Sequence, residues 1–394
     1  MIANIVHTSL NPRGGSERLA ITAMQALSKM GSEINLTTFE RPNISQLESA
    51  YGEAATSVIK RIKTTNILRS LKKTESNKHY DLIINTHGDM LPYFLPSFSK
   101  SNAITYCHFP LAKYLIDSRD PEYAKFLRST ILSTMSTRKK NSYQKYFDLA
   151  RTAYIHMLKK TTVLSNSEFS RSVIKKAFGV DSVVLSPPVD VDFFRNMSLL
   201  SSSSSNNNNN NNNNDTILVI SRFHPTKKIE NAIRLAKLLK ERKIGGRMKI
   251  VGNLPPGTPG YLYYLKQMVD HYDLDDYVKF EINVNFGRLL KLMRESKVYL
   301  HPLVGEPFGI STVEAMSSGL IPVVPNIGGH TEFVPPKYQY RTFGEGVEAI
   351  TAALMAPDSE RMLISDSVKR FSIDSFINHF QEIIENIISS KIKP

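Results

Sequence analysis

Short apolar runs alternate along this chain with longer segments of helical periodicity. The segment 17–31 repeats its apolar residues at helical spacing and stops at Gly31, and the segment 228–242 has the same character. Runs that begin as buried strands, several of which continue into a loop, lie at 2–8, 81–88, 103–110, 161–167 and 182–190, and again at 216–223, 248–253, 298–307 and 321–329. Strands that alternate with helices indicate parallel sheets, and each half of the chain starts with its own strand–loop–helix unit. We therefore expect an α/β protein with two doubly wound, Rossmann-like domains.

The boundary between the two halves is marked by a tract of serines and asparagines, Ser201 to Asn214. Such a tract cannot bury apolar surface and is typical of a flexible tether. The sequence therefore predicts an N-terminal domain over 1–200, a linker over 201–214 and a C-terminal domain over 215–374. A final helix at about 375–394 can pack back onto the first domain.

Composition limits the class of protein. With 394 residues and 41% hydrophobic residues, the chain can build two cores of ordinary size. The single cysteine, Cys107, excludes an internal disulfide and suits a reducing compartment. The first residues lack the pattern of a signal peptide, and no apolar stretch reaches the length of a membrane span. We expect a cytoplasmic protein, which can still lie at the cytoplasmic face of a membrane.

The net charge of +14 is concentrated in the first half of the chain. Residues 1–200 contain 27 Lys and Arg against 16 Asp and Glu, and residues 128–176 contain eleven basic and two acidic residues. Such a bias indicates an anionic partner, which could be a phosphorylated substrate, an acidic lipid surface or nucleic acid. A solvated basic surface without a partner is the alternative.

Four candidate functional positions directly follow predicted strands: Gly14, His108, Arg222 and Glu306. In doubly wound sheets ligands bind beyond the carboxyl ends of the strands, so a ligand shared by two such domains would lie in the cleft between them. Gly14 and Gly15 could let a backbone approach a phosphate at a helix N-terminus, or could form a plain tight turn. The sequence contains neither a Walker A motif nor G-x-G-x-x-G.

Basic residues and a histidine provide further candidates. Arg222, with Lys227 and Lys228 close behind it, suits a diphosphate, although surface charge ahead of a helix would look the same. His108 is either a satisfied, partly buried histidine or a donor and proton carrier at a strand end. His87 has a similar but less well framed position.

A metal site is not expected. Asp190 and Asp192 imitate a D-x-D metal motif, but the pair follows a double proline, which favours a structural turn. The ten histidines and the single cysteine have no zinc spacing.

The segment 305–319, "GEPFGISTVEAMSSG", holds two carboxylates, Glu306 and Glu314, among apolar and small residues. Ser311 and Glu314 fit an S-x-x-E capping box, with Gly319 as the helix stop. That explanation leaves Glu306 without a role.

These motifs together resemble family 4 of the retaining glycosyltransferases, whose fold is the two-domain GT-B fold. The resemblance covers nearly the whole chain and depends on "GGSER" (14–18), "NSEFSRSVIKKAFG" (166–179), "LSPPVDVDFF" (185–194), "SRFHPTKK" (221–228), "EPFGISTVEAMSSGLIPVV" (306–324) and "GGHTE" (328–332). In addition, "YCHFP" (106–110) is similar to a motif of the mannosyltransferases that extend lipid-linked oligosaccharides.

The resemblance implies a role for each matching residue. Glu306 would face the donor sugar and His108 would touch the sugar near the reacting carbon. Glu314 would accept hydrogen bonds from the ribose. Residues that would hold the diphosphate are Arg222, Lys227 with Lys228 as the alternative, the loop Phe308, Gly309 and Ile310 with its N–H groups, and Gly14 with Gly15 from the other domain. Departures from the family pattern are Ser16, Ser221 and the Ser/Asn tract.

The expected function is a retaining, metal-independent transfer of a hexose from a nucleotide sugar, with GDP-mannose as the favoured donor and no cofactor. The acceptor would be a lipid-linked or other glycan, because residues 122–160 mix basic and aromatic residues at helical spacing and could lie on an anionic membrane. That basic helix could instead pack on its own domain. The alternatives are a UDP-hexose donor with another acceptor, an epimerase or phosphorylase of the same fold, and a non-catalytic sugar-nucleotide-binding subunit. Only the net charge favours nucleic acid as a partner.

Overall fold

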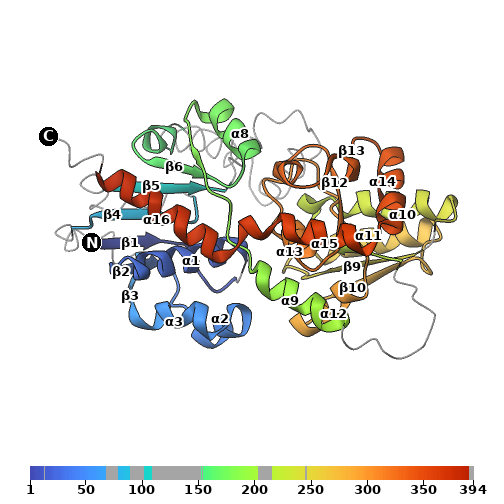
Figure 1. Cartoon of the computed structure of the whole chain (residues 1–394), viewed down its shortest axis with the longest axis horizontal. Coiled ribbons are helices and arrows are strands. Elements are labelled where there is room, and N and C mark those ends of the chain that lie inside the picture. Colours follow the sequence, from blue (N-terminus) through green and yellow to red (C-terminus); the bar gives the residue numbers. More distant parts are fainter. Residues whose placement is uncertain are drawn as a thin grey trace, which may run out of the picture. The chain divides into compact units, whose positions relative to one another are not determined.

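The chain is described by a computed structural model over residues 1–12, 14–67, 79–88, 102–108, 152, 154–202, 215–244 and 246–389. It divides into two compact units (Figure 1). The N-terminal unit comprises Met1–Pro188 together with Ile373–Pro394, and the C-terminal unit comprises Val189–Ser372. Each unit is built on a parallel sheet, which confirms the predicted α/β class.

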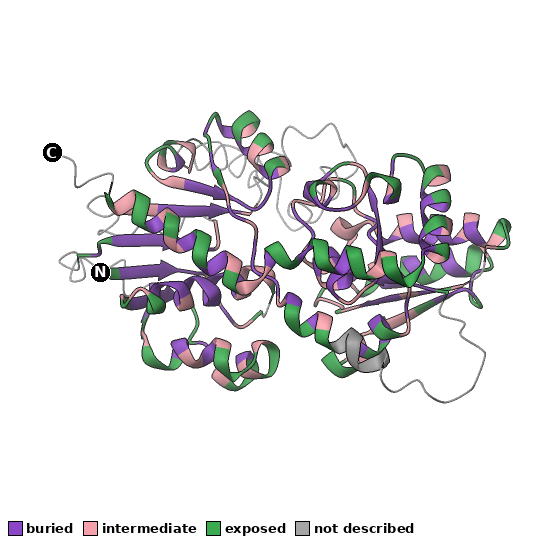
Figure 2. Ribbon diagram, in the orientation of Figure 1, coloured by how far each residue is buried: buried purple, intermediate pink, exposed green. Residues whose placement is uncertain are grey.

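The N-terminal unit contains a seven-stranded sheet in the order β3-β2-β1-β4-β5-β6-β7, and all neighbouring strands are parallel. The strands are β1 (Ile2–Val6), β2 (Glu33–Thr38), β3 (Lys63–Asn66), β4 (Leu82–Asn85), β5 (Asn102–Cys107), β6 (Thr162–Ser165) and β7 (Val183–Val184). The helices α1 (Gly15–Lys29), α2 (Ile44–Tyr51), α3 (Glu53–Arg61), α8 (Glu168–Phe178) and α16 (Ile373–Ser389) surround the sheet. The central strands are buried on both faces, as their apolar runs require (Figure 2).

Helix α16 comes from the C-terminal end of the chain and completes the core of the N-terminal unit. Its buried face consists of Phe376, Ile377, Phe380 and Ile384. Gln381 donates a hydrogen bond to the Ala26 carbonyl of α1 at 2.9 Å, and the two helices lie side by side in Figure 1. The last helix is therefore an integral part of the first unit.

The C-terminal unit contains a six-stranded parallel sheet in the order β10-β9-β8-β11-β12-β13. Its strands are β8 (Thr216–Ile220), β9 (Arg247–Gly252), β10 (Val278–Ile282), β11 (Val298–Leu300), β12 (Ile321–Pro325) and β13 (Gln339–Tyr340). Its helices are α9 (Val191–Ser202), α10 (Ile229–Glu241), α11 (Pro259–His271), α12 (Phe286–Arg294), α13 (Ile310–Ser317), α14 (Phe343–Met355) and α15 (Asp358–Ser367). Four 3₁₀ turns accompany them: η4 (Pro225–Lys227), η5 (Gly329–Glu332), η6 (Pro336–Tyr338) and η7 (Lys369–Phe371).

The unit boundary lies earlier than the sequence predicted. The N-terminal domain was expected to end at residue 200, but α9 packs within the C-terminal unit. Phe194 of α9 is buried against Leu218 and Tyr299, and the Val189 N–H donates to the Phe371 carbonyl at 2.9 Å. The boundary therefore follows Pro188, the second proline of a pair that interrupts regular structure, and residues 203–214 of the predicted linker lie outside the described residues.

Candidate active site

The backbone of Glu306 is fixed at the carboxyl ends of β11 and β12. Gly305, with φ 80°, donates its N–H to the Ile327 carbonyl at 2.8 Å, and Gly329 donates to the Glu306 carbonyl at 2.8 Å. Gly328 lies between these two hydrogen bonds with φ 138°, and a Cβ there would come within 2.7 Å of the Glu306 carbonyl oxygen. The two glycine-rich loops therefore hold Glu306 at the strand ends where α/β sheets bind ligands.

The Glu306 carboxylate has two nitrogen partners on other elements. Its Oε2 lies 3.0 Å from Lys227 Nζ and 3.3 Å from His301 Nε2. The side chain is only 14% exposed. Burial works against ionisation, but the Lys227 ammonium and the His301 ring outweigh it and hold the pKa of Glu306 well below its usual range. Glu306 is therefore a partly buried anion at neutral pH.

The two lysines of "TKK" have different partners. Lys227 ends the 3₁₀ turn η4 and contacts Glu306, whereas Lys228 adopts a left-handed conformation with φ 51° and its Nζ lies 3.9 Å from Glu230. Arg222 is exposed just beyond β8. Between the two alternatives left open by the sequence, Lys227 is the lysine that reaches the Glu306 carboxylate.

Helix α13 begins at Ile310, with Gly309 as its N-cap at φ 103° and no side-chain cap. Ser311 is thus the second helical residue, and its hydroxyl lies 2.8 Å from the Tyr299 hydroxyl. The capping-box interpretation of Ser311 and Glu314 is therefore wrong. Glu314 lies half-buried on the second turn, and the uncapped helix start presents backbone N–H groups, an arrangement that favours anions.

Phe308 has a structural role in this loop. Its side chain is buried and packs against Phe333 and Phe371, with ring centroids 5.3 and 5.2 Å away. The substrate contact expected of Phe308 would therefore have to come from its backbone.

Two histidines of the C-terminal unit were not singled out from the sequence. His301, buried directly after β11, contacts Glu306, and its ring centroid lies 5.4 Å from that of His330. His330 donates through Nε2 to the Pro325 carbonyl at 2.7 Å, and burial together with His301 lowers the pKa of His330 to about 4. The strand-end rule that selected His108 would also have selected His301.

In the N-terminal unit, the start of α1 carries its own carboxylate. The Gly14 N–H donates to Glu17 Oε2 at 2.6 Å, and Glu17 Oε1 lies 3.6 Å from His7 Nε2. Burial opposes ionisation of Glu17, but His7 outweighs it and lowers the pKa of Glu17 to about 2. Gly14 and Gly15 therefore begin a helix whose first N–H is bound by Glu17, as in a capping box.

His108 lies at the end of β5 in a fixed orientation. Its Nε2 is 2.9 Å from the Thr86 carbonyl, and a carbonyl can only accept, so Nε2 carries the proton. Burial lowers the pKa of His108 to about 4, which keeps the ring neutral. The Nδ1 atom can then only accept a hydrogen bond, which differs from the donor and proton carrier expected from the sequence. The less well framed His87 packs edge-on against the buried His7, with ring centroids 5.1 Å apart.

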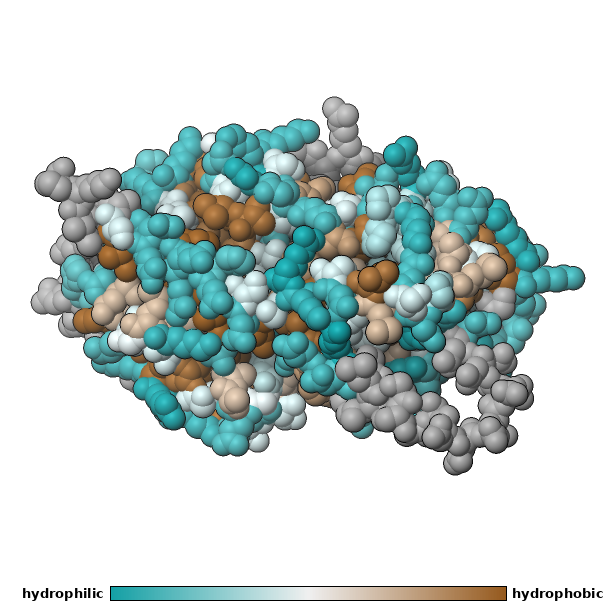
Figure 3. All heavy atoms as spheres, viewed as in Figure 1, coloured by the Kyte–Doolittle hydropathy of each residue, from teal (hydrophilic) through white to brown (hydrophobic). Residues whose placement is uncertain are grey.

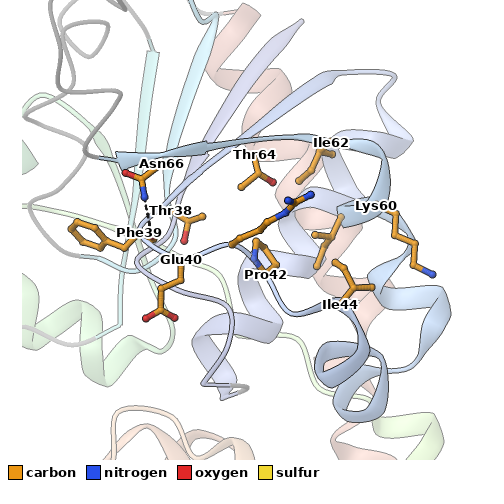
Figure 4. Close-up of a pocket in the computed structure, with 11 residues that line it drawn as sticks. Thr38, Phe39, Glu40, Pro42, Ile44, Lys60, Ile62, Thr64 and Asn66 are labelled. Carbon is orange, nitrogen blue, oxygen red and sulfur yellow. Dashed lines mark hydrogen bonds between the residues drawn. The ribbon is translucent and has the colours of Figure 1, made fainter.

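A cavity of about 760 Å³ opens at the carboxyl ends of β2 and β3 (Figure 4). Isoleucines of α2 and α3 form part of its wall, and Arg41 and Lys60 also line it. Its Glu40 accepts a hydrogen bond from Ser9 at 2.9 Å, so the cavity adjoins the loop that leads to Gly14. It does not include the Glu306 site, which belongs to the other unit.

Asp190 acts as a helix cap. Its carboxylate accepts from the Phe193 N–H at 3.4 Å at the start of α9. Within the described ranges, no group of three His, Cys, Asp or Glu side chains could hold a metal ion.

The sequence and the fold are similar to those of known proteins. Residues 202–365 match the family model described as glycosyl transferases group 1. The structure also resembles HepE of Anabaena in complex with UDP-glucose, with a TM-score of 0.67, 17% identity and coverage of 98% of this chain and 100% of that one. Residues 202–365 are thus similar to a group 1 glycosyltransferase domain, and the structural likeness confirms the predicted GT-B fold.

Relatives with a named activity also match this chain in sequence. The GDP-Man:Man(3)GlcNAc(2)-PP-Dol alpha-1,2-mannosyltransferase of Dictyostelium discoideum is 28% identical over 57% of this chain and 46% of its own length. The enzyme of the same name from Neurospora crassa is 24% identical over 79% of this chain and 61% of its own length. The chain therefore spans about half the length of the curated relatives it matches.

Proposed function

We propose that this protein transfers a mannosyl group from GDP-mannose to a lipid-linked oligosaccharide, with retention of configuration and without a metal ion. The observation that carries the proposal is the Glu306–Lys227 ion pair at the carboxyl edge of the C-terminal sheet. The uncapped start of α13 follows Glu306 in the same loop. The names of the Dictyostelium and Neurospora relatives support the mannose donor and the lipid-linked acceptor.

The diphosphate of the donor would lie against Arg222, Lys227 and the N–H groups of Gly309 and Ile310. Breaking the glycosyl–phosphate bond leaves extra negative charge on the diphosphate, where fixed cations and oriented N–H dipoles stabilise the transition state. This arrangement supplies the charge that a divalent metal would otherwise supply. Lys227 is a flexible point charge with three donor hydrogens, so it can turn from Glu306 toward the phosphate when the donor binds.

The sugar would lie beside the Glu306 carboxylate. The reacting carbon becomes cationic as the bond breaks, and an anion with a strongly lowered pKa stays charged beside it. Glu314, one turn after the start of α13 at Ile310, would accept hydrogen bonds from the ribose. With retention, the leaving phosphate takes the acceptor proton, which needs no side-chain base.

His108 would contribute from the N-terminal unit as a neutral hydrogen-bond acceptor. With Nε2–H donated to Thr86, its Nδ1 is suited to a sugar hydroxyl. Of the predicted glycine pair, Gly15 would add a backbone contact to the phosphate, because the Gly14 N–H is already bound by Glu17.

A specific observation favours a second donor. The HepE structure contains UDP-glucose, so a UDP-hexose transferred to another acceptor is the alternative. A non-catalytic sugar-nucleotide-binding subunit is the other alternative, and it would bind a donor without turnover.

A panel of GDP- and UDP-sugars, assayed with a lipid diphosphate oligosaccharide, tests the proposal. We expect turnover with GDP-mannose, an axial product linkage by NMR and full activity in EDTA. The Glu306→Gln and Lys227→Met variants should lose on the order of 100-fold or more in kcat, the size of effect seen when one charge-stabilising group is removed. Glu348→Gln, on the exposed face of α14, is the matched control.

The outcomes separate the alternatives. Turnover with a UDP-sugar alone would replace the donor, and donor binding without turnover would favour the non-catalytic subunit. An inverted product or full activity of Glu306→Gln would overturn the mechanism.

A further inference from the structure

A single row of polar side chains in contact connects the start of α13 to the Glu306 carboxylate. Ser311 Oγ lies 2.8 Å from the Tyr299 hydroxyl, which lies 3.0 Å from His301 Nδ1. On the other side of the ring, His301 Nε2 lies 3.3 Å from Glu306 Oε2. Tyr299 is fully buried and His301 is 4% exposed, so the middle of the row is shielded from water.

The chemistry of the end groups gives this row one direction. Glu306 is ionised and can only accept, so the 3.3 Å contact is favourable when His301 carries its proton on Nε2. In the neutral ring, Nδ1 then accepts the proton of the Tyr299 hydroxyl, and the oxygen of Tyr299 accepts from Ser311. Burial raises the pKa of Tyr299, so its hydroxyl keeps the proton it donates.

The two partners of Glu306 differ in stiffness. Lys227 is a flexible point charge, and a diphosphate would compete for it. The His301 ring is held at Nδ1 by Tyr299 and is buried on all sides. His301 is therefore the partner able to keep the carboxylate in one orientation when Lys227 turns toward the donor.

We propose that His301 is a positioning residue, which Tyr299 and Ser311 orient so that Glu306 faces the donor sugar while Lys227 binds the diphosphate. The inference depends on the proposed function for the identity of the sugar site. It adds Tyr299 and His301, at the end of β11, and Ser311, in the first turn of α13, to the proposed site. The start of α13 would then bind the diphosphate through its N–H groups and orient the Glu306 carboxylate through Ser311.

Tyr299→Phe is the most selective variant, because it removes one hydroxyl and keeps the buried ring. We expect kcat to fall about tenfold with little change in the KM for the donor, since a misplacement of the order of 1 Å can cost up to about 100-fold. The matched control is Tyr340→Phe. The Tyr340 hydroxyl is also buried and donates to His301, but to its backbone carbonyl at 3.2 Å. This control should keep kcat within about twofold.

At His301 itself, two variants distinguish positioning from packing. Gln can still donate an N–H toward Glu306, so His301→Gln should keep much more of kcat than His301→Leu, which cannot donate. Thermal unfolding of both variants gives the cost of repacking separately from the effect on turnover.

A crystal structure of His301→Leu provides a readout that does not need turnover. We expect the Glu306 carboxylate to leave the orientation described above, while in Tyr340→Phe it stays. An unchanged Glu306 in His301→Leu, or equal losses of kcat in Tyr299→Phe and Tyr340→Phe, would overturn the inference. If no donor on the panel turns over, the proposed function fails, and the crystallographic comparison still decides the positioning role.

Discussion

At the scale of single residues, His330 makes the stability of the protein depend on pH. Its ring is fully buried, and burial together with the neighbouring His301 lowers the pKa of His330 to about 4, from an unfolded value near 6.5. Below pH 6.5 the unfolded chain binds a proton that the native state does not, so stability falls as the pH falls toward 4. We expect His330 to account for a loss of about 2 kcal/mol between pH 6.5 and 5.

Urea unfolding of the wild type and of His330→Gln at these two pH values measures this contribution. Gln can keep the hydrogen bond to the Pro325 carbonyl but does not titrate, so its stability should fall less over the same interval. The lowered pKa values of Glu17 and Glu306 act only below about pH 4.5, outside this window. Equal losses in the two proteins would refute the assignment to His330.

The roles of single residues could be predicted from the sequence where the spacing of a motif defines them. They could not be predicted where they depend on tertiary contacts. Glu306 and Lys227 follow from their motifs, and they meet across 79 positions. The S-x-x-E pattern misplaced the start of α13 because it describes only local hydrogen bonds. The actual start is fixed by Gly309, whose left-handed backbone lies close to His330 of another loop. The partnership of His301 with Glu306 likewise depends on distances that no local pattern contains.

At the scale of elements, helix α16 should be required for the stability of the N-terminal unit. Phe380 on its inner face is 2% exposed and packs in the core that includes α1 and β1. Replacing a buried phenylalanine by alanine costs about 3–5 kcal/mol. Phe380→Ala should therefore lower the unfolding midpoint of that unit in calorimetry, while Glu382→Ala, on the exposed face of the same helix, should leave it unchanged. Equal midpoints for the two variants would mean that α16 contributes little to this core.

Buried strands were predictable from the sequence, whereas an edge strand and the helix at the unit boundary were not. Strands β1, β4 and β8 are mainly apolar and mostly buried, and they were predicted as strands. The edge strand β3 has the polar sequence "KTTN" and is half exposed, so no apolar run marks it. The Ser/Asn tract misplaced the unit boundary because α9, which precedes it, contributes Phe194 to the C-terminal core.

At the scale of the whole molecule, the described fold does not explain why the basic residues are concentrated in the first half of the chain. The excess of Lys and Arg lies in residues 1–200, and much of it falls in 128–176. Most of the basic and aromatic segment 122–160 lies outside the described residues, so its predicted membrane role stays a prediction. Of the helices that the structure describes, none is both long and apolar enough to cross a bilayer. The face seen in Figure 3 is mainly hydrophilic, with scattered hydrophobic patches.

The proposed lipid-linked acceptor and the basic N-terminal half together predict binding to anionic membranes. Each Lys or Arg near an anionic surface contributes about 1 kcal/mol, and screening weakens this attraction within a Debye length of about 10 Å at 0.1 M salt. We expect the 394-residue chain to float with vesicles that contain phosphatidylserine, to float less as the salt concentration rises, and not to bind neutral vesicles. Replacing Arg138, Lys139 and Lys140 by glutamine should weaken flotation, whereas the same change at Lys237, Lys240 and Lys243 of the C-terminal unit should not. Equal flotation of the two triple variants would show that overall charge, and not the segment 122–160, directs the protein to the membrane. An absence of lipid-dependent flotation would contradict the proposed membrane contact.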